Sequence, residues 1–236
     1  MDNNFYSREI LNEDDLRRIR EQFQTIQFCD GIHTLTGNPF ENVENNHKMK
    51  NCLNDTADIE NQKIASIIYA ALDRDRGFYK FSCPEKTNSP IISRTEVGGY
   101  YRAHHDDGMI GDYSTTVFLN DPSEYEGGEL RLKLGSGVET FKMPAGHAVT
   151  YSTGIPHEVS EVTSGCRDVA VFWTTAKFAD HALRDIHRDL LYLQERLDEV
   201  LPGKAGYPSI EEASEDPSFL VEQIIHKMIR RYRRTS

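Results

Sequence analysis

The sequence predicts a mainly β core flanked by helices, with the strands antiparallel in a sandwich or barrel. After Pro90 the chain changes to short β-branched and aromatic runs separated by glycines, which is typical of strands joined by tight turns. On both sides of this block, apolar residues recur at three- and four-residue steps, which indicates amphipathic helices. With 236 residues, of which 38% are hydrophobic and 28% charged, the composition fits one soluble globular domain.

Two helices are expected before the β block. The segment NEDDLRRIREQF, residues 12–23, begins with acidic side chains and has apolar residues at helical spacing. Residues 58–72 carry isoleucines and leucines largely on one stripe, so we expect this helix to cover a face of a sheet. Residues 29–54 are rich in Gly, Asn and Thr without a sustained period, and we expect loop with short strands there.

The β block and the helices after it follow from the same patterns. Strand-like runs are predicted at residues 91–95, 114–119, 129–134, 139–141, 148–152, 157–162 and 167–174. Helices are then predicted at 183–201 and from 217, separated by a linker with two prolines and two glycines. We therefore expect one domain, with helical support in residues 1–85, the β core in 86–178 and C-terminal helices in 179–236.

Composition also restricts the partners. A net charge of −11 argues against nucleic-acid binding, and the basic stretch Lys227–Arg234 suits the C-terminal end of a helix dipole. No run approaches the roughly 20 apolar residues that span a membrane, and the start MDNNFYSREI lacks a secretory signal pattern, so we expect a cytoplasmic protein. The four cysteines lie far apart without a C-x-x-C pair, and we expect isolated thiols.

Three residues of the β block are candidate metal ligands. His104 and Asp106 are two apart, so on an extended strand both would project to one face. His157 begins a later strand-like run, just after the turn residues Gly154-Ile155-Pro156. Two imidazoles and a carboxylate suit Fe(II), although Mn, Co, Ni and Zn accept the same ligands.

Arg167, ten residues after His157, is the second informative residue. It begins an apolar strand, and a buried guanidinium without an anionic partner would cost several kcal/mol. A dicarboxylate with a 2-oxo acid end would meet both needs, because it could chelate the metal and pair its far carboxylate with Arg167. Alternatively, Arg167 pairs with Asp168 or with a surface glutamate.

Spacing leaves the ligand register open. His105 and Asp107 form an equally good H-x-D pair one residue along, and a shift of one residue moves a side chain to the other face of a strand. His147 is another candidate third ligand, but its place in the turn Pro144-Ala145-Gly146-His147 favours an exposed loop histidine.

The segment from Gly98 to Trp173 resembles the Fe(II)- and 2-oxoglutarate-dependent dioxygenases, in particular the prolyl 4-hydroxylase-like branch and its bacterial PKHD-type hydroxylases. The stretches that carry the resemblance are YYRAHHDD, STTVFLNDPSEYEGGEL and MPAGHAVTYSTGIPHEVSEVTSGCRDVAVFW, about a third of the chain. The resemblance implies a double-stranded β-helix, or jelly roll. It also favours His104 and Asp106 over the shifted pair, with His157 as the distal ligand and Arg167 as the 2-oxoglutarate anchor.

The resemblance further implies an oxidoreductase that uses O2, Fe(II) and 2-oxoglutarate, releases succinate and CO2, and binds ascorbate. It suggests an amino-acid or peptidyl substrate, with proline as one candidate. The chain departs from its relatives at Arg94-Thr95-Glu96 and at Phe118, where tyrosines occur in some of them. Both changes remove a hydroxyl that could contact the cosubstrate, and Ser114 and Thr116 are our candidate replacements.

Two other classes of function compete with this interpretation. A cupin-like metal-binding sensor without turnover is suggested by the PAG turn, although the H-x-H of cupins is missing. A zinc hydrolase could be built on the HHDD run. We also expect a homo-oligomer through the C-terminal helices, while the identity of the hydroxylated molecule is not readable from the sequence.

Overall fold

The structure is a computed structural model, and it describes residues 4–23, 26, 28–30, 49–52, 59–106, 110–135, 137–201, 207 and 209–234. The chain forms two compact units. The first comprises Met1–Arg76 and Lys86–Thr175, and the second comprises Gly77–Glu85 and Ala176–Ser236. The division expected at residues 85 and 178 stays a prediction.

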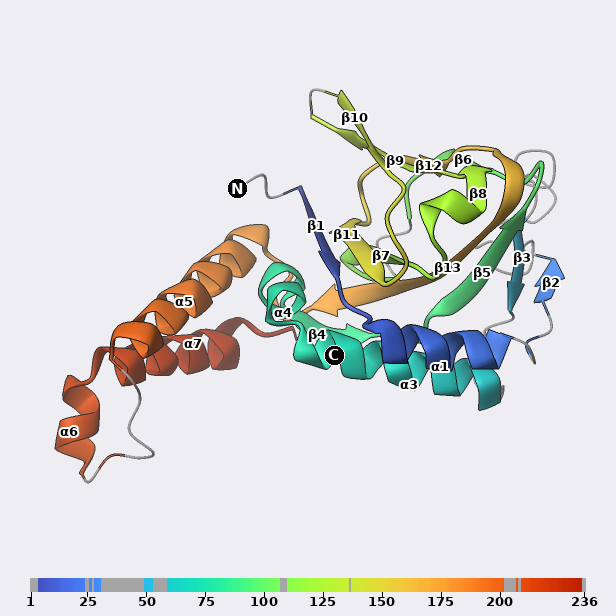
Figure 1. Cartoon of the computed structure of the whole chain (residues 1–236). Helices are drawn as coiled ribbons and strands as arrows, with labels where there is room; N and C mark the ends of the chain where they lie inside the picture. The colour runs from blue at the N-terminus through green and yellow to red at the C-terminus, as the bar shows by residue number, and fades with distance from the viewer. Residues whose placement is uncertain are drawn as a thin grey trace. The chain divides into compact units, whose positions relative to one another are not determined.

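The first unit is built around a nine-stranded antiparallel sheet (Figure 1). Its strand order is β1 (Phe5–Glu9), β11 (His147–Ser152), β7 (Tyr113–Phe118), β13 (Val162–Ala176), β5 (Ile91–Glu96), β3 (Met49–Cys52) and β2 (Phe28–Asp30). Two further strands, β4 (Pro84–Thr87) and β8 (Tyr125–Gly127), also pair with β13. A 3-10 turn at Pro122–Glu124 precedes β8.

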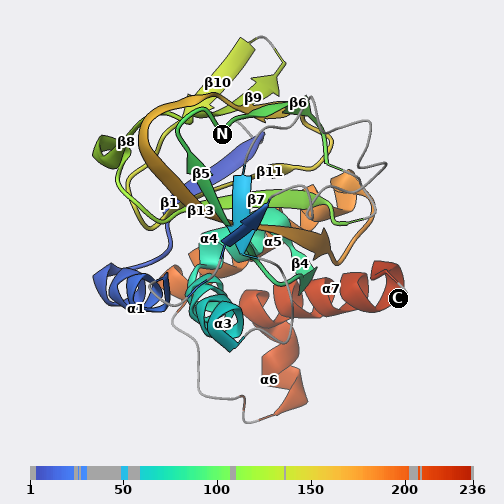
Figure 2. The same ribbon diagram turned by 90° about the vertical axis from the view of Figure 1, so that its right-hand side faces the viewer.

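A four-stranded sheet in the order β10 (Gly137–Phe141), β9 (Leu130–Leu134), β12 (His157–Val159) and β6 (Tyr101–His104) lies over the larger one (Figures 1 and 2). The inward residues of both sheets form one apolar cluster, because side chains alternate between the two faces of a strand. Its buried members are Phe118, Leu130, Leu132, Phe141, Val149, Tyr151 and Val169. This packing fixes which residues of β7, β11 and β13 face the interior.

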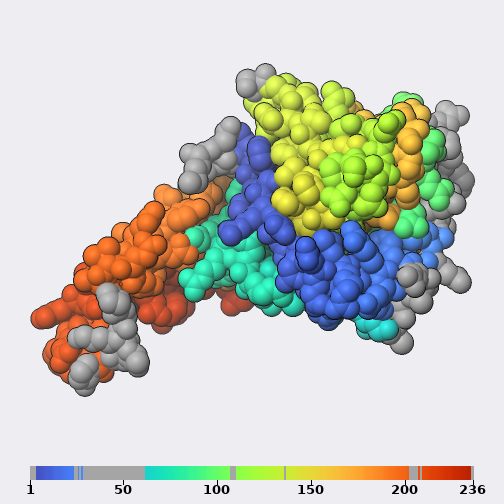
Figure 3. All heavy atoms as spheres, viewed as in Figure 1, coloured from blue at the N-terminus to red at the C-terminus, as the bar shows by residue number. Residues whose placement is uncertain are grey.

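Helices α1 (Glu13–Phe23) and α3 (Ile59–Arg74) lie on the other side of the larger sheet (Figure 2). In the space-filling view, the blue residues of β1 and α1 lie directly beside the yellow and green residues of the β core (Figure 3). On this outer face Arg94 pairs with Asp168, and its guanidinium lies 4.7 Å from the centroid of the Phe28 ring. Arg94 and Asp168 thus satisfy each other's charge on this face.

The second unit contains most of α4 (Arg76–Ser82), together with α5 (His181–Val200), α6 (Ile210–Glu215) and α7 (Pro217–Tyr232). Asp180 caps α5 and Asp216 caps α7 by accepting backbone N–H bonds, as expected for N-terminal caps. Its core includes Cys83, Phe178 and Met228. No helix among the described residues is long and apolar enough to cross a membrane.

Most predicted elements are confirmed, with informative exceptions. The predicted run 157–162 is split, because the chain leaves the smaller sheet after Val159 and enters the larger sheet at Val162. The expected loop at 29–54 falls largely outside the described residues, apart from β3 and part of β2. The prediction missed β1, β4, β6, β8, α4 and α6, which are all short.

Candidate metal centre and cosubstrate site

Two histidines meet on neighbouring strands of the smaller sheet. His104 ends β6 and His157 begins β12, and the two are direct partners in the antiparallel register, with ring centroids 4.2 Å apart. The Nδ1 of His104 lies 2.8 Å from the carbonyl oxygen of Arg102, and that of His157 lies 2.9 Å from the carbonyl oxygen of Ile155. A carbonyl can only accept, so Nδ1 carries the proton in both rings and Nε2 keeps its lone pair for a metal.

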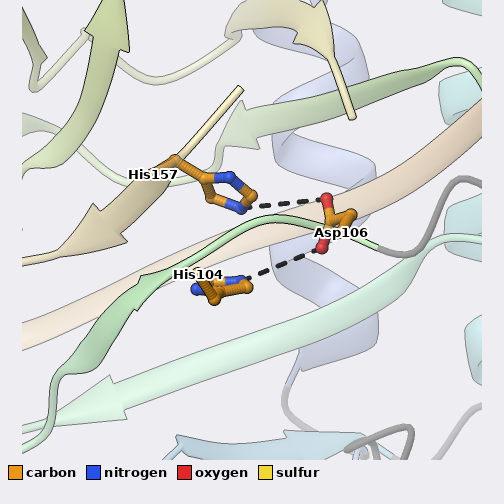
Figure 4. A group of neighbouring side chains, drawn as sticks. All are labelled: His104, Asp106 and His157. Carbon is orange, nitrogen blue, oxygen red and sulfur yellow. Dashed lines mark ion pairs between the residues drawn. The ribbon is translucent and has the colours of Figure 1, made fainter. Parts of the chain in front are cut away.

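Asp106 completes a cluster in which the three side chains point toward one another (Figure 4). Its Oδ1 lies 3.8 Å from Nε2 of His104, and its Oδ2 lies 3.7 Å from Nε2 of His157. The potential ligand atoms all lie within 4.8 Å of one another. Strand β6 ends at His104, so Asp106 reaches the cluster from the segment after the strand, whereas the spacing predicts both residues on the strand.

The carboxylate of Asp106 is held in place by two donors. Its Oδ2 accepts a hydrogen bond of 2.9 Å from Nε1 of Trp173 and another from the Ser114 hydroxyl. Trp173 and Ser114 are register partners on β13 and β7, so both donors come from rigid neighbouring strands. Because Oδ2 already has two partners, Oδ1 is the oxygen best placed to bind a metal, and outer partners of this kind orient metal ligands.

The surroundings of the cluster keep the His104 ring and the neighbouring Tyr101 phenol uncharged at neutral pH. Burial, with the neighbouring His157 as the next cause, lowers the pKa of His104 from 6.5 to about 4. The ring of Tyr101 lies against that of His104, with centroids 3.9 Å apart. Burial and the charge of Asp106 raise the pKa of Tyr101 to about 12. At neutral pH the cluster therefore offers a neutral imidazole at His104 beside a neutral phenol.

Arg167 lies on the interior face of β13, with 2% of its surface exposed. Among the described residues, its Nε has no hydrogen-bond partner and no carboxylate forms an ion pair with it. Burial lowers its pKa, and its guanidinium lies over the ring of Phe118 at 5.6 Å. The alternative partner, Asp168, faces the other side of the strand and pairs with Arg94 through two bonds of 2.8 Å. A ligand carboxylate would supply what Arg167 lacks.

Tyr151 interacts with both the histidine cluster and Arg167. Its ring stands edge-on to that of His157, with centroids 5.0 Å apart. Burial, and next the charge of Asp106, raise the pKa of its phenol, whereas a hydrogen bond with Thr116 and the charge of Arg167 lower it. Tyr151 is thus close to a proposed metal ligand and within reach of the charge of Arg167.

The two residues that we expected to contact the cosubstrate occupy this interior face of β7. Ser114 and Thr116 alternate with Thr115, whose hydroxyl contacts Thr150 on the opposite face. Ser114 donates to Asp106, and Thr116 hydrogen-bonds to Tyr151. Contact of either residue with the cosubstrate stays a prediction, and the bond of Ser114 indicates a role in holding a metal ligand.

The other histidine candidates are not in the cluster. His105 is exposed, and Asp107 lies outside the described residues. His147 begins strand β11 beside Glu9 of β1, and it is half-buried. The expectation of an exposed loop histidine at position 147 was therefore wrong, because pairing with β1 draws the residue into the sheet. Among the described residues, only His104, Asp106 and His157 form a cluster suited to a metal.

Two residues with roles at this site, Trp173 and Tyr151, were not predicted from the sequence. Trp173 lies six residues after Arg167 on the same strand, and an even spacing places both on one face, so this signal was available. Tyr151 had no comparable signal, because its closeness to His157 and Arg167 depends on how β11 pairs with β7.

Comparisons with known proteins agree with this geometry. Residues 90–175 match the sequence model of the 2OG-Fe(II) oxygenase superfamily. A PKHD-type hydroxylase of Synechococcus sp. (strain JA-2-3B'a(2-13)) is 32% identical over 197 residues, covering 80% of this chain and 85% of the relative. A PKHD-type hydroxylase of Hyphomonas neptunium is 34% identical over 186 residues, covering 75% of this chain and 80% of the relative.

Solved structures show the same fold. A prolyl hydroxylase from Trichoplax adhaerens, in complex with a hypoxia inducible factor peptide fragment, matches with a TM-score of 0.56 at 15% identity, over 74% of this chain and 84% of that one. A Pseudomonas putida prolyl-4-hydroxylase matches with a TM-score of 0.52 at 17% identity, over 73% of this chain and 92% of that one. The jelly-roll prediction is thereby confirmed. The chain belongs to the PKHD-type hydroxylases of the 2OG-Fe(II) oxygenase superfamily, and is an oxidoreductase that uses Fe(II) and 2-oxoglutarate.

Proposed function

We propose that His104, Asp106 and His157 bind the catalytic Fe(II), and that Arg167 binds the far carboxylate of 2-oxoglutarate. The observation that carries this assignment is the presence of two incomplete sites, one on each sheet, that both lie near Tyr151. The cluster offers Nε2 of each histidine and Oδ1 of Asp106. The buried guanidinium of Arg167 lacks an anion among the described residues. A 2-oxo diacid has one end for each site.

The residues of the chain then have distinct tasks. The bound iron, with 2-oxoglutarate and O2, supplies the oxidising chemistry. The backbone carbonyls of Arg102 and Ile155 fix the histidine tautomers, while Trp173 and Ser114 fix the carboxylate of Asp106. These bonds hold the ligands in place before the metal arrives, which lowers the cost of binding.

For the substrate, we propose a peptidyl or free amino acid, with a prolyl side chain as the first candidate. The support comes from relatives named hydroxylases, and from structural neighbours that are prolyl hydroxylases, one of them solved with a peptide fragment. A screen of free amino acids and proline-containing peptides for a mass gain of one oxygen, with and without Fe(II), tests this choice. Hydroxylation of a non-peptide molecule alone would overturn it.

The metal assignment is tested by the conversion of 2-oxoglutarate to succinate. Asp106→Ala should abolish Fe(II)-dependent conversion while the circular dichroism spectrum keeps its native shape. His147→Ala, which removes a histidine outside the cluster, is the matched control and should retain conversion. If Asp106→Ala stays active, the ligand register is wrong, and the same assay on Asp107→Ala then identifies the alternative.

Three further expectations also stand as proposals. A homo-oligomer through the C-terminal helices is supported by the apolar side chains that α5 and α7 expose, namely Ile186, Leu193, Val200, Leu220 and Ile224. Light scattering after size-exclusion chromatography tests it, and a monomer would overturn it. Ascorbate binding and a cytoplasmic location rest on family resemblance and on composition, respectively.

A further inference from the structure

Helix α5 buries one side against its own unit. His187 is fully buried, with Nδ1 3.3 Å from the thiol of Cys83. Asp198 accepts a hydrogen bond of 3.0 Å from the hydroxyl of Ser218 on α7. Positions 187 and 198 are eleven residues, or about three turns, apart, so both lie on the same side of the helix. This side of α5 therefore has its partners within the C-terminal unit.

Next to this side, α5 carries an apolar stripe that its own unit covers only in part. The members of the stripe follow one another at alternating steps of three and four residues: Leu183, Ile186, Leu190, Leu193, Leu197 and Val200. Every second member is strongly exposed, with Ile186 at 50%, Leu193 at 47% and Val200 at 75%. Alternating steps of three and four residues form the seam along which two helices pack as a coiled coil.

Charged residues beside the stripe restrict which helix fits against it. Asp189 and Arg196 are both exposed and seven residues apart, so they lie on the same edge of the stripe. Arg196 pairs with Glu199 of its own helix, but both side chains are more than half exposed, so this pair contributes little energy and can exchange partners. The edge thus offers a partner one negative and one positive charge, one heptad apart.

We propose that a second copy of this chain binds the stripe, with the two α5 helices antiparallel about a two-fold axis. In the register that places Leu190 against the partner's Leu193, every member of the stripe meets an apolar residue. The same register places Asp189 beside the partner's Arg196, twice by symmetry. A parallel pair would place Asp189 beside the partner's Gln194, without charge pairing. The inference rests on the homo-oligomer proposed above and assigns it a helix, an orientation and a size.

The test is a charge reversal in the full-length protein, with the dimer dissociation constant measured by sedimentation over a wide range of concentration. Asp189→Arg places two arginines together at both symmetric contacts, and Arg196→Asp places two aspartates together. Each change should weaken the dimer by roughly 5- to 30-fold. The double variant Asp189→Arg/Arg196→Asp restores both opposite-charge pairs and should return to within about threefold of the wild-type affinity.

Leu193→Asp tests the apolar stripe itself. It places a charge opposite an apolar residue of the partner and should weaken the dimer by about 100-fold or more. Glu222→Arg is the matched control, because it makes the same change in net charge as Asp189→Arg at an exposed position of α7 outside the stripe. It should leave the dimer unchanged. A helical circular dichroism signal at the wild-type level shows that each variant is folded.

Two kinds of outcome would contradict the inference. If the wild-type protein is a monomer at every concentration, the antiparallel pair and the homo-oligomer fail together. If it forms an oligomer of another size, or a dimer that withstands the single reversals or is not restored by the double variant, the antiparallel α5 pair fails. The homo-oligomer then stands and forms through another face.

Discussion

The two units of this protein each bury an arginine at 2% exposure, but they treat it differently. In the C-terminal unit, Arg184 donates hydrogen bonds of 2.6 Å and 3.0 Å to the backbone oxygens of Phe178 and Ala179. In the β core, Arg167 has neither a carboxylate nor a carbonyl partner for its Nε among the described residues. Burial alone therefore does not distinguish a structural arginine from one that binds a ligand, whereas the presence of partners does.

The buried histidines of the two units differ in what their ring nitrogens face. His187 of α5 is fully buried, with Nδ1 3.3 Å from the thiol of Cys83, and its Nε2 meets no hydrogen-bond partner in the described part of the chain. His157 of the β core has its Nδ1 fixed by a carbonyl and turns Nε2 toward Asp106. The first arrangement fills a core, and the second presents a lone pair to a site where a metal can bind.

The largest expected effect separates the two arginines. Arg167→Met should weaken 2-oxoglutarate binding by about 100-fold, which is about 2.7 kcal/mol, without lowering the unfolding temperature of the ligand-free protein. Arg184→Met should leave the affinity unchanged and lower the stability of the C-terminal unit by about 2 kcal/mol, since two carbonyls lose their donor. Calorimetric titration and hydrogen exchange of α5 and α7 measure the two effects. If Arg184→Met weakened 2-oxoglutarate binding and Arg167→Met lowered only stability, the assignment of one arginine to a ligand and the other to the fold would be wrong.

A second prediction concerns the donors behind Asp106. Ser114→Ala and Trp173→Phe each remove one hydrogen bond to Oδ2 and should lower metal affinity by roughly 10- to 100-fold. Titration with Mn(II), followed by electron paramagnetic resonance, measures the change. Thr115→Val, on the other face of β7, serves as the control. Normal metal affinity in both variants would mean that the hydrogen bonds from Ser114 and Trp173 to Asp106 do not contribute to metal binding.

The third prediction uses the histidine of the C-terminal unit. Burial, with the charge of Lys177 as the second cause, lowers the pKa of His187 from 6.5 to about 4. Between these values the unfolded chain binds more protons than the folded chain, so stability is lost as the pH falls below about 6.5. We expect a loss of about 2 kcal/mol at pH 5.

Denaturant unfolding, followed by the helical circular dichroism signal at pH 7 and pH 5, measures this loss. His187→Leu should remove most of the pH dependence. His226→Leu, which changes an exposed histidine of α7, should keep it. An equal pH dependence in both variants would assign the effect to other groups.

The smallest expected effect compares two glycines with positive φ. Gly98 has φ +83°, and no described atom lies within 4 Å of the place that a Cβ would take, so Gly98→Ala should cost only about 1 kcal/mol of backbone strain. Gly128→Ala, at φ +66°, should add a severalfold loss of 2-oxoglutarate affinity, because the new methyl group would press on the side chain of Arg167. Thermal unfolding and calorimetric titration of both variants distinguish strain from displacement of the arginine.

Local sequence patterns predicted much of the fold. The apolar stripes at residues 12–23 and 58–72 predicted α1 and α3 within two residues at each end, because an amphipathic helix has a period that does not depend on distant contacts. Short strands such as β1 and β8 were missed. Their residues are only partly apolar, and they are strands because a neighbouring strand pairs with them.

The sequence by itself determined the chemical types at the site, namely two histidines, an aspartate and an arginine in a β-rich block, and resemblance selected His104 and Asp106 as the ligand pair. Only the tertiary structure decided which atoms are available. In the structure, Asp168 lies on the outer face and pairs with Arg94. Oδ2 of Asp106 accepts hydrogen bonds from Ser114 and Trp173, and Arg167 has no anionic partner among the described residues. The physical reason is that pairing register sets which face each side chain occupies and which partner it meets there, and register joins strands that are distant in the chain.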